Sequence, residues 1–227
     1  MRNNYVSLHE HQKELLQRHL EFVFAYNQKV NLTHITSYEK GMVLHVEDSL
    51  TGLTEVNNAP AGSLVDIGSG GGYPGIPLAV ASGRHTVLLE SVRKKAEALE
   101  LFIKQEKLEE TIKVFAKRSE DYAREEKPGH AVVTARAVCE LSELVELAAP
   151  LMADNGHLIC YKAKPSLEEL SRGFKAAEIC GLKEVSKRPC LLSDKETRRL
   201  LIVFEKIAKP KIELPRRNGM AKKHPLV

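Results

Sequence analysis

The segment LVDIGSGGGYPGIPLAV, Leu64 to Val80, decides the fold of this 227-residue chain. It runs from a short apolar stretch through five glycines into a stretch with the composition of a helix. Glycine has no Cβ, so a backbone of this composition can turn tightly and come close to a ligand. We therefore expect a strand, a ligand-binding turn and a helix, with a tight turn that binds nothing as the alternative.

Neighbours of the glycines indicate which ligand the turn would bind. The segment Gly70–Gly75 matches the G-x-G-x-x-G pattern of dinucleotide sites. However, Pro74 has no amide hydrogen to offer a pyrophosphate, and the Asp66 carboxylate before Gly68 would repel one. The same carboxylate suits a ligand that carries an ammonium and a sulfonium group, so Asp-x-Gly-x-Gly favours S-adenosylmethionine over NAD. No Gly-Lys-Ser/Thr follows, which argues against a P-loop. The candidate cofactor-binding residues of the turn are Asp66, Gly68, Ser69 and Gly70.

A second acidic residue ends the next strand-like segment. Glu90 closes HTVLLE, about 20 residues beyond the first glycines, where a carboxylate can accept hydrogen bonds from ribose hydroxyls. The alternative is an acid at the start of a helix, which the helix dipole would stabilise. We add Glu90 to the candidate cofactor-binding residues.

Strand-like and helix-like segments alternate through the rest of the chain, which predicts an α/β fold with a mostly parallel sheet. The last two strand-like segments, 185–192 and 198–206, are too close for a crossover helix and should pair antiparallel. The other expected strands are 63–67, 85–90, 111–116, 130–137 and 157–162, and the expected helices are 74–82, 92–105, 140–152 and 166–180.

Both ends of the chain differ from this alternating region. Helical spacing of apolar residues over 8–26 and 38–53 predicts an N-terminal helical extension, residues 1–57. The α/β domain then covers 58–208, and a basic tail covers 209–227. The tail has six Lys or Arg residues, one acidic residue and three prolines, so we expect it to be extended.

Composition excludes several classes of protein. The chain is 43% hydrophobic and 28% charged, which is the ordinary globular range, and its net charge of +4 is only mildly basic. Its four cysteines form no C-x-x-C pair, so neither a zinc site nor a redox motif is expected. No apolar run is long enough for a membrane span, so we expect a cytoplasmic protein without a metal.

Motifs along nearly the whole chain point to one family. They are NLTHIT (31–36), HVEDSL (45–50), DIGSGGGYPGIPLA (66–79), LLESVRKKAE (88–97), KRSED (117–121), TARAV (134–138) and PRRNGMAKKHPL (215–226). In this order they resemble the bacterial RsmG (GidB) family of 16S rRNA guanine-N7 methyltransferases. Three departures are Tyr26-Asn27 for the usual Trp-Asn, YKAK (161–164) for Lys-Gly after the fifth strand, and Glu47 for an aliphatic residue.

The resemblance implies a class I S-adenosylmethionine-dependent methyltransferase fold, Rossmann-like, with an antiparallel last strand and a helical extension. It also implies that Gly68 and Tyr73 line the cofactor pocket, that Ser119 and Glu120 flank the adenine, and that Arg136 lies beside the cofactor or the target base. By themselves, Ser119 and Glu120 would read as ordinary loop residues, and Arg136 as a surface arginine at a strand end. The candidate substrate-binding residues are Asn31, His45, Asp48, Arg216, Arg217, Lys222 and Lys223. His45 and Asp48 could instead tie the extension to the domain, and the tail arginines could pack against it.

The implied reaction transfers a methyl group to N7 of a guanine in 16S rRNA, either free or within the small ribosomal subunit or an assembly intermediate. N7 carries a lone pair and no proton, so no general base is needed, and positioning can supply the catalysis. The alternatives are a methyltransferase acting on a small molecule or a protein, an NAD(P)-dependent oxidoreductase, and an RNA-binding module without activity.

Overall fold

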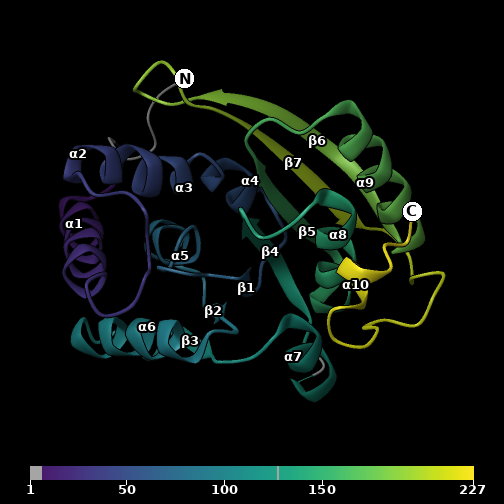
Figure 1. Cartoon of the computed structure of the whole chain (residues 1–227), viewed down its shortest axis with the longest axis horizontal. Coiled ribbons are helices and arrows are strands. Elements are labelled where there is room, and N and C mark those ends of the chain that lie inside the picture. Colours follow the sequence, from purple (N-terminus) through teal and green to yellow (C-terminus); the bar gives the residue numbers. More distant parts are fainter. Residues whose placement is uncertain (1–6, 127) are drawn as a thin grey trace.

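A seven-stranded sheet forms the centre of the computed structural model, which describes residues 7–126 and 128–227 (Figure 1). The strand order is β3-β2-β1-β4-β5-β7-β6. Strands β1 to β5 are parallel, and β7 is antiparallel to both β5 and β6. This confirms the prediction that the last two strands pair antiparallel. The strands are β1 Leu64–Ile67, β2 Thr86–Leu89, β3 Ile112–Phe115, β4 His130–Arg136, β5 Met152–Lys162, β6 Leu182–Leu191 and β7 Arg198–Lys206.

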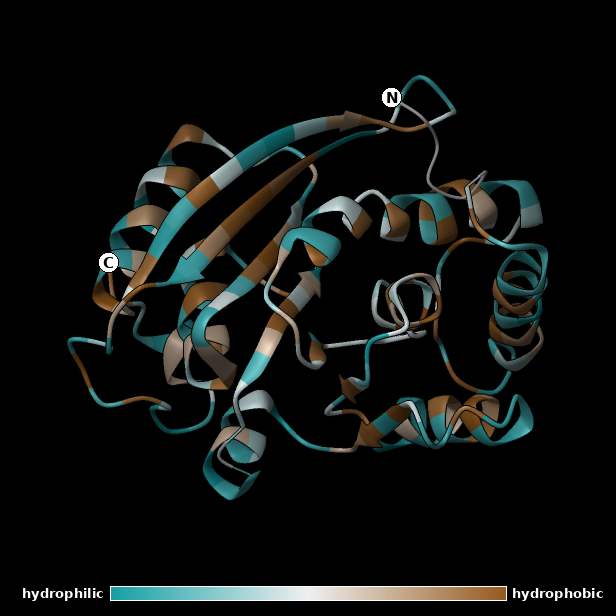
Figure 2. Ribbon diagram, turned by 180° about the vertical axis from the view of Figure 1, so that it is seen from behind, coloured by the Kyte–Doolittle hydropathy of each residue, from teal (hydrophilic) through white to brown (hydrophobic). Residues whose placement is uncertain are grey.

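Helices cover both faces of the sheet, because side chains at successive strand positions point to opposite faces. Leu64 and Val132 pack under α4 and α5, whereas Val65 and Val133 pack under α8 and α9. The strands of the sheet are accordingly rich in hydrophobic residues, and the helices are hydrophobic on one side (Figure 2). The main helices are α1 Glu10–Tyr26, α4 Leu53–Asn58, α5 Gly75–Ser82, α6 Arg93–Gln105, α7 Ser119–Glu126, α8 Leu141–Ala148 and α9 Leu167–Ile179.

The N-terminal helices pack against the first helix of the α/β unit. Leu16 and Leu20 of α1 share a hydrophobic cluster with Val46, Leu50 and Tyr73, beside α5. Residues 38–58 are helical throughout most of their length, as α2 Tyr38–Gly41, a π-helical turn Met42–Glu47, α3 Asp48–Leu50 and α4. The sequence pattern predicted the helical stretch but not its π-helical turn. The boundary between residues 57 and 58 stays a prediction.

Two local predictions were wrong. Residues Ser119–Glu126 form helix α7, where no helix was expected between the third and fourth strands. The tail is not extended: it folds back along α7 and α8 and contains a short helix, α10 Met220–Lys223 (Figure 1). Its contacts, given below, explain why it folds. Within the described residues, no helix is both long and apolar enough to span a membrane.

Candidate active site

The glycine loop leaves β1 and binds the end of the neighbouring strand through its own backbone. The amides of Gly68 and Ser69 donate to the Leu89 carbonyl oxygen at 2.8 and 3.1 Å. The Gly70 amide donates to Glu90 Oε2 at 2.9 Å. Gly68 and Gly70 adopt φ values of +67° and +56°, which residues with a Cβ rarely adopt. The turn therefore requires glycine at these two positions.

The second half of the loop also uses its amides internally. Gly72 and Tyr73 donate to the Ser69 carbonyl oxygen at 2.7 and 3.1 Å, and Gly75 donates to Asp66 Oδ2 at 3.2 Å. A pyrophosphate needs several free amides at such a turn. Because six amides between Gly68 and Gly75 are already engaged, the geometry argues against a dinucleotide.

Asp66 lies beneath the loop rather than at a cavity surface. It is fully buried, and its two carboxyl oxygens accept from the Gly75 amide and from Thr134 Oγ1, the latter at 2.9 Å. Burial raises its pKa to about 6. The hydrogen bonds from Thr134, Ser69 and Gly75 act in the opposite direction, but their effect is smaller than that of burial. This placement differs from the expected direct contact with a cationic ligand. It favours a role in holding the loop against β4.

Glu90 also holds the loop. Glu90 accepts from the Gly70 amide through Oε2, and from the Val92 amide through Oε1 at 2.7 Å. The residue is buried. Ser91, rather than Glu90, lines the adjacent cavity. Each oxygen of a carboxylate can accept more than one hydrogen bond, so contact with a ribose stays a prediction.

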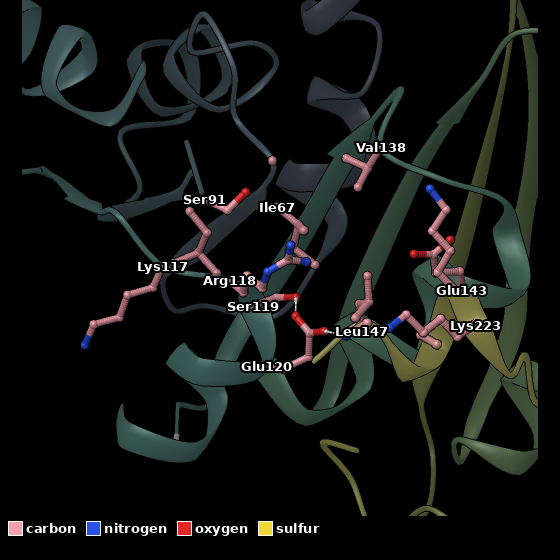
Figure 3. A pocket seen from close by; sticks show the side chains of 15 residues that line it. Ile67, Ser91, Lys117, Arg118, Ser119, Glu120, Val138, Glu143, Leu147 and Lys223 are labelled. Atoms are coloured by element: carbon pink, nitrogen blue, oxygen red, sulfur yellow. Dashed lines mark hydrogen bonds between the residues drawn. The ribbon is translucent and has the colours of Figure 1, made fainter. Parts of the chain in front are cut away.

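A cavity of about 400 Å³ opens at the carboxyl ends of β1, β2 and β3 (Figure 3). We call it the cofactor cavity. Of the predicted residues, it is lined by Gly68, Ser119, Glu120, Lys222 and Lys223. Ser119 Oγ donates to Glu120 Oε2 at 3.3 Å, at the start of α7. Residues that sequence reasoning missed also line it: Ile67, Leu89, Ser91, Lys117, Arg118, Val138, Glu143, Leu147, Gly219 and Ala221.

A second cavity, of about 360 Å³, lies between the π-helical turn and the ends of β4, β5 and β7. We call it the acceptor cavity. It brings together three predicted residues, His45, Asp48 and Arg136. It also includes Tyr161, Lys162 and Arg199, which were not predicted as site residues. The YKAK departure therefore lies at the wall of this cavity.

An ion network forms one wall of the acceptor cavity. The Asp48 carboxylate is fully buried and accepts from Arg136 Nη1 at 2.9 Å and from Arg199 Nε at 3.0 Å. Arg136 also donates to the Leu44 carbonyl oxygen at 2.9 Å. Asp48 thus ties the N-terminal helices to β4 and β7, as one of the two sequence hypotheses proposed.

Tyr73 stacks on His45 instead of lining the cofactor cavity. Their ring centroids are 4.5 Å apart with an interplanar angle of 9°, and the His19 ring also contacts Tyr73, with ring centroids 4.6 Å apart. His45 Nε2 lies 2.7 Å from Thr33 Oγ1. Burial, together with the charge of Arg136, lowers the pKa of His45 to about 3, so this ring is neutral at physiological pH. Tyr73 therefore supports His45, which lines the acceptor cavity.

One short segment separates the two cavities. Arg136 lines the acceptor cavity and Val138 lines the cofactor cavity, with Ala137 between them at a φ of +56°. Val138 also packs over the glycine loop, since a Cβ placed on Gly68 would lie 3.0 Å from its Cγ2. The cavities are therefore neighbours at the carboxyl edge of the sheet, which is where open α/β sheets bind ligands.

The remaining candidate substrate residues are scattered. Asn31 and Arg217 are exposed and line neither cavity. Arg216 is paired with Glu146 of α8 in a two-pronged ion pair, at 2.7 and 2.6 Å, so its guanidinium group already has a partner within the protein, and its contact with RNA stays a prediction. An internal partner for Arg216 could not be read from a tail with one acidic residue. Glu47, which stands where the family usually has an aliphatic residue, accepts hydrogen bonds from the amide and the hydroxyl of Ser193 in the β6–β7 connection.

The described residues contain no group of three His, Cys, Asp or Glu side chains arranged to hold a metal ion, and the four cysteines are free.

Comparison with known proteins identifies the family. The family model of rRNA small subunit methyltransferase G, GidB, matches residues 12–200. Ribosomal RNA small subunit methyltransferase G of Chloroflexus aggregans is 35% identical over 224 residues, covering 97% of this chain and 93% of that protein. The protein of the same name from Bacillus pumilus is 31% identical over the same coverage.

Solved structures support the fold. A sarcosine dimethylglycine methyltransferase homologue from Galdieria sulphuraria superposes with a TM-score of 0.58 at 12% identity, covering 85% of this chain and 99% of that one. A geranyl diphosphate methyltransferase in complex with S-adenosylmethionine gives 0.52 at 10% identity, covering 70% and 84%. These likenesses confirm the predicted class I methyltransferase fold. The fold and the sequence matches together show that the chain belongs to the GidB family of rRNA small subunit methyltransferases.

Proposed function

We propose that this enzyme transfers the methyl group of S-adenosylmethionine to N7 of a guanine in 16S rRNA. The observation that carries the proposal is the pair of cavities on either side of residues 136–138, in a chain that belongs to an rRNA methyltransferase family. One cavity suits a nucleoside-sized cofactor, and the other opens beside it with three cationic side chains on its wall.

The cofactor cavity fits S-adenosylmethionine in size and in chemistry. Its volume of about 400 Å³ lies in the range of small-molecule sites. Gly68 provides bare backbone at its floor, and Ser119 and Glu120 provide polar atoms at the start of α7. Glu90 and Asp66 would support this site from behind by fixing the loop, and Ser91 is a candidate partner for the ribose. When bound, the cofactor supplies an electrophilic methyl group on a sulfonium centre.

The acceptor cavity would bind the guanine. On the major-groove edge of guanine, both N7 and O6 are hydrogen-bond acceptors. Lys162, Arg136 and Arg199 offer donors that can hold O6 or a backbone phosphate while N7 stays free. N7 has no proton to lose, so the residues of the chain need only hold the base in line with the methyl group. Methylation leaves a positive charge on the base, which makes Arg136 a positioning residue rather than an acid.

The three segments would divide this task. Residues 1–57 would wall the acceptor cavity, residues 58–208 would hold the sheet and both cavities, and residues 209–227 would complete the cofactor side. Asn31 and Arg217 are exposed and would face rRNA, either free or in a small-subunit assembly intermediate, whereas Lys222 and Lys223, also exposed, line the cofactor cavity. The proposed enzyme would act where ribosomes assemble, in the cytoplasm.

Methyl transfer to RNA provides the test. The protein would be incubated with S-adenosylmethionine and either naked 16S rRNA or small subunits lacking the modification, and the nucleosides would be analysed by mass spectrometry. We expect 7-methylguanosine to form with one of these substrates. Methylation of an rRNA atom other than guanine N7 would contradict the proposal. Methylation of a small molecule or a protein, with no reaction on rRNA, would also contradict it.

A further inference from the structure

The C-terminal segment Arg216–Lys223 is fixed to the α/β unit by buried and charged contacts; we call it the C-terminal wall. Arg216 Nε and Nη2 donate to the two carboxyl oxygens of Glu146 at 2.7 and 2.6 Å, and Glu146 is 3% exposed. Arg216 Nη2 also donates to the His224 carbonyl oxygen at 2.8 Å. Paired, two-pronged bonds between arginine and a carboxylate fix orientation as well as position. This ion pair therefore docks the wall on α8.

A second set of contacts docks the wall on α7. The Gly219 amide donates to Glu120 Oε1 at 3.0 Å, and Asn218 Nδ2 donates to Asp121 Oδ2 at 2.7 Å. Arg124 donates to both the Arg216 carbonyl oxygen and the Asn218 side chain. The wall thus bridges α7 and α8, which are separate walls of the cofactor cavity.

Docking on two helices places the wall along the cavity itself. Gly219, Ala221, Lys222 and Lys223 line the cofactor cavity, and Ala221 is 3% exposed. Lys223 and Leu147 lie across the cavity from Ser91 and Lys117 (Figure 3). Without the wall, the side of the cavity between Glu120 and Glu143 would be open to water.

We infer that the C-terminal wall is part of the cofactor-binding site, so that cofactor affinity depends on it. Small-molecule sites bury most of their ligand, and a site that loses one wall loses the corresponding contacts. Glu120 connects the two functions, because one carboxylate both lines the cavity and holds Gly219. The inference rests on the proposed function, and it assigns Lys222 and Lys223, which the sequence suggested as substrate-binding residues, to the cofactor side.

Equilibrium binding of S-adenosylhomocysteine, measured by calorimetry, tests the inference. Lys222→Ala/Lys223→Ala alters exposed side chains, so the variant should fold, and we expect at least a severalfold weaker affinity. Arg216→Ala should weaken binding by about tenfold or more, because the wall loses its dock on α8. The matched control is Lys211→Ala, which removes a tail cation that forms an ion pair with the exposed Glu178 and lines neither cavity. Its affinity should equal that of the parent.

Limited trypsin digestion gives a second readout, because trypsin cleaves after Arg217, Lys222 and Lys223. Saturating S-adenosylhomocysteine should slow cleavage at these sites in the parent, and should protect Arg216→Ala less. The inference would be overturned, and the proposed function left intact, if every wall variant bound S-adenosylhomocysteine with the affinity of the parent. The same would follow if the rate of tryptic cleavage in the parent did not change on addition of the ligand. A parent chain that binds no S-adenosylhomocysteine would instead overturn the proposed function itself.

Discussion

The two cavities hold their carboxylates in different ways. Beside the cofactor cavity, Asp66 and Glu90 accept mainly from backbone amides of the glycine loop and its surroundings. In the acceptor cavity, Asp48 accepts from two arginine side chains. A carboxylate bound to amides fixes the path of the chain, whereas one shared by two guanidinium groups fixes the position of two side-chain donors at a cavity wall. The glycine-loop side of the cofactor cavity is therefore held by backbone hydrogen bonds, and the wall of the acceptor cavity by side-chain charge.

Removing Asp48 should have the largest effect. Asp48→Ala leaves Arg136 and Arg199 without their shared partner, and both side chains are more than four-fifths buried. Removing one member of such a buried pair costs about 3–5 kcal/mol of unfolding free energy. Urea denaturation followed by circular dichroism, which suits a chain without tryptophan, would measure it.

A matched control for Asp48 is Glu97→Ala, which removes the exposed ion pair Arg93–Glu97. Exposed pairs of this kind contribute little, so the control should melt like the parent. If Asp48→Ala were as stable as Glu97→Ala, the side-chain network would not hold the acceptor wall.

Asp66 should give a pH-dependent effect of intermediate size. Its folded pKa of about 6 lies above the usual aspartate value of 3.8, so the folded state binds the proton more tightly than the unfolded chain. Its contribution to stability is therefore fully present below pH 3.8 and is lost as the pH rises through 6. The difference between the two pKa values corresponds to about 3 kcal/mol.

Asp66→Asn isolates this effect from buried histidines such as His19, whose pKa of about 3 has the opposite influence in acid. The stability of the parent relative to Asp66→Asn should fall between pH 4 and pH 7. A difference that does not vary with pH would show that the Asp66 carboxyl is not buried as the loop geometry requires.

Glu47→Ala should have the smallest effect. Glu47 bonds the amide and hydroxyl of Ser193 at the outer edge of the acceptor side. Loss of these partly exposed bonds should cost about 1 kcal/mol or less. Amide hydrogen exchange would check it: exchange should accelerate in residues 192–197 and stay unchanged in β1. Unchanged exchange in both regions would mean that Glu47 does not anchor this connection.

The sequence predicts the backbone-built side of the molecule well. Glycines with positive φ, an apolar strand and a helix signal are local features, so the β1–α5 turn and the alternation of the sheet could be read directly. The antiparallel end of the sheet followed from a short connection in the same way.

The side-chain network could not be read, because its members lie far apart in the chain. Asp48 and Arg199 are separated by 151 positions, and no local pattern marks either as the partner of the other. The same reason explains the tail: its composition indicates an extended segment, and the pairing of Arg216 with Glu146 overrides that preference. Whether the site residues bind as proposed stays a prediction.

The position of the C-terminal wall in the chain has a consequence for the synthesis of the protein. Glu120 and Gly219 are 99 positions apart, so their hydrogen bond cannot form until 99 further residues have been translated after Glu120. At about 5–20 residues per second, the ribosome needs roughly 5–20 seconds to make the intervening residues. At the start of that interval only β1, β2 and β3 have been made; β4 to β7 are added next, and the C-terminal wall is the last part of the cofactor cavity to be translated. On the inference drawn above, a chain that stopped before Gly219 would have all seven strands but would bind the cofactor more weakly.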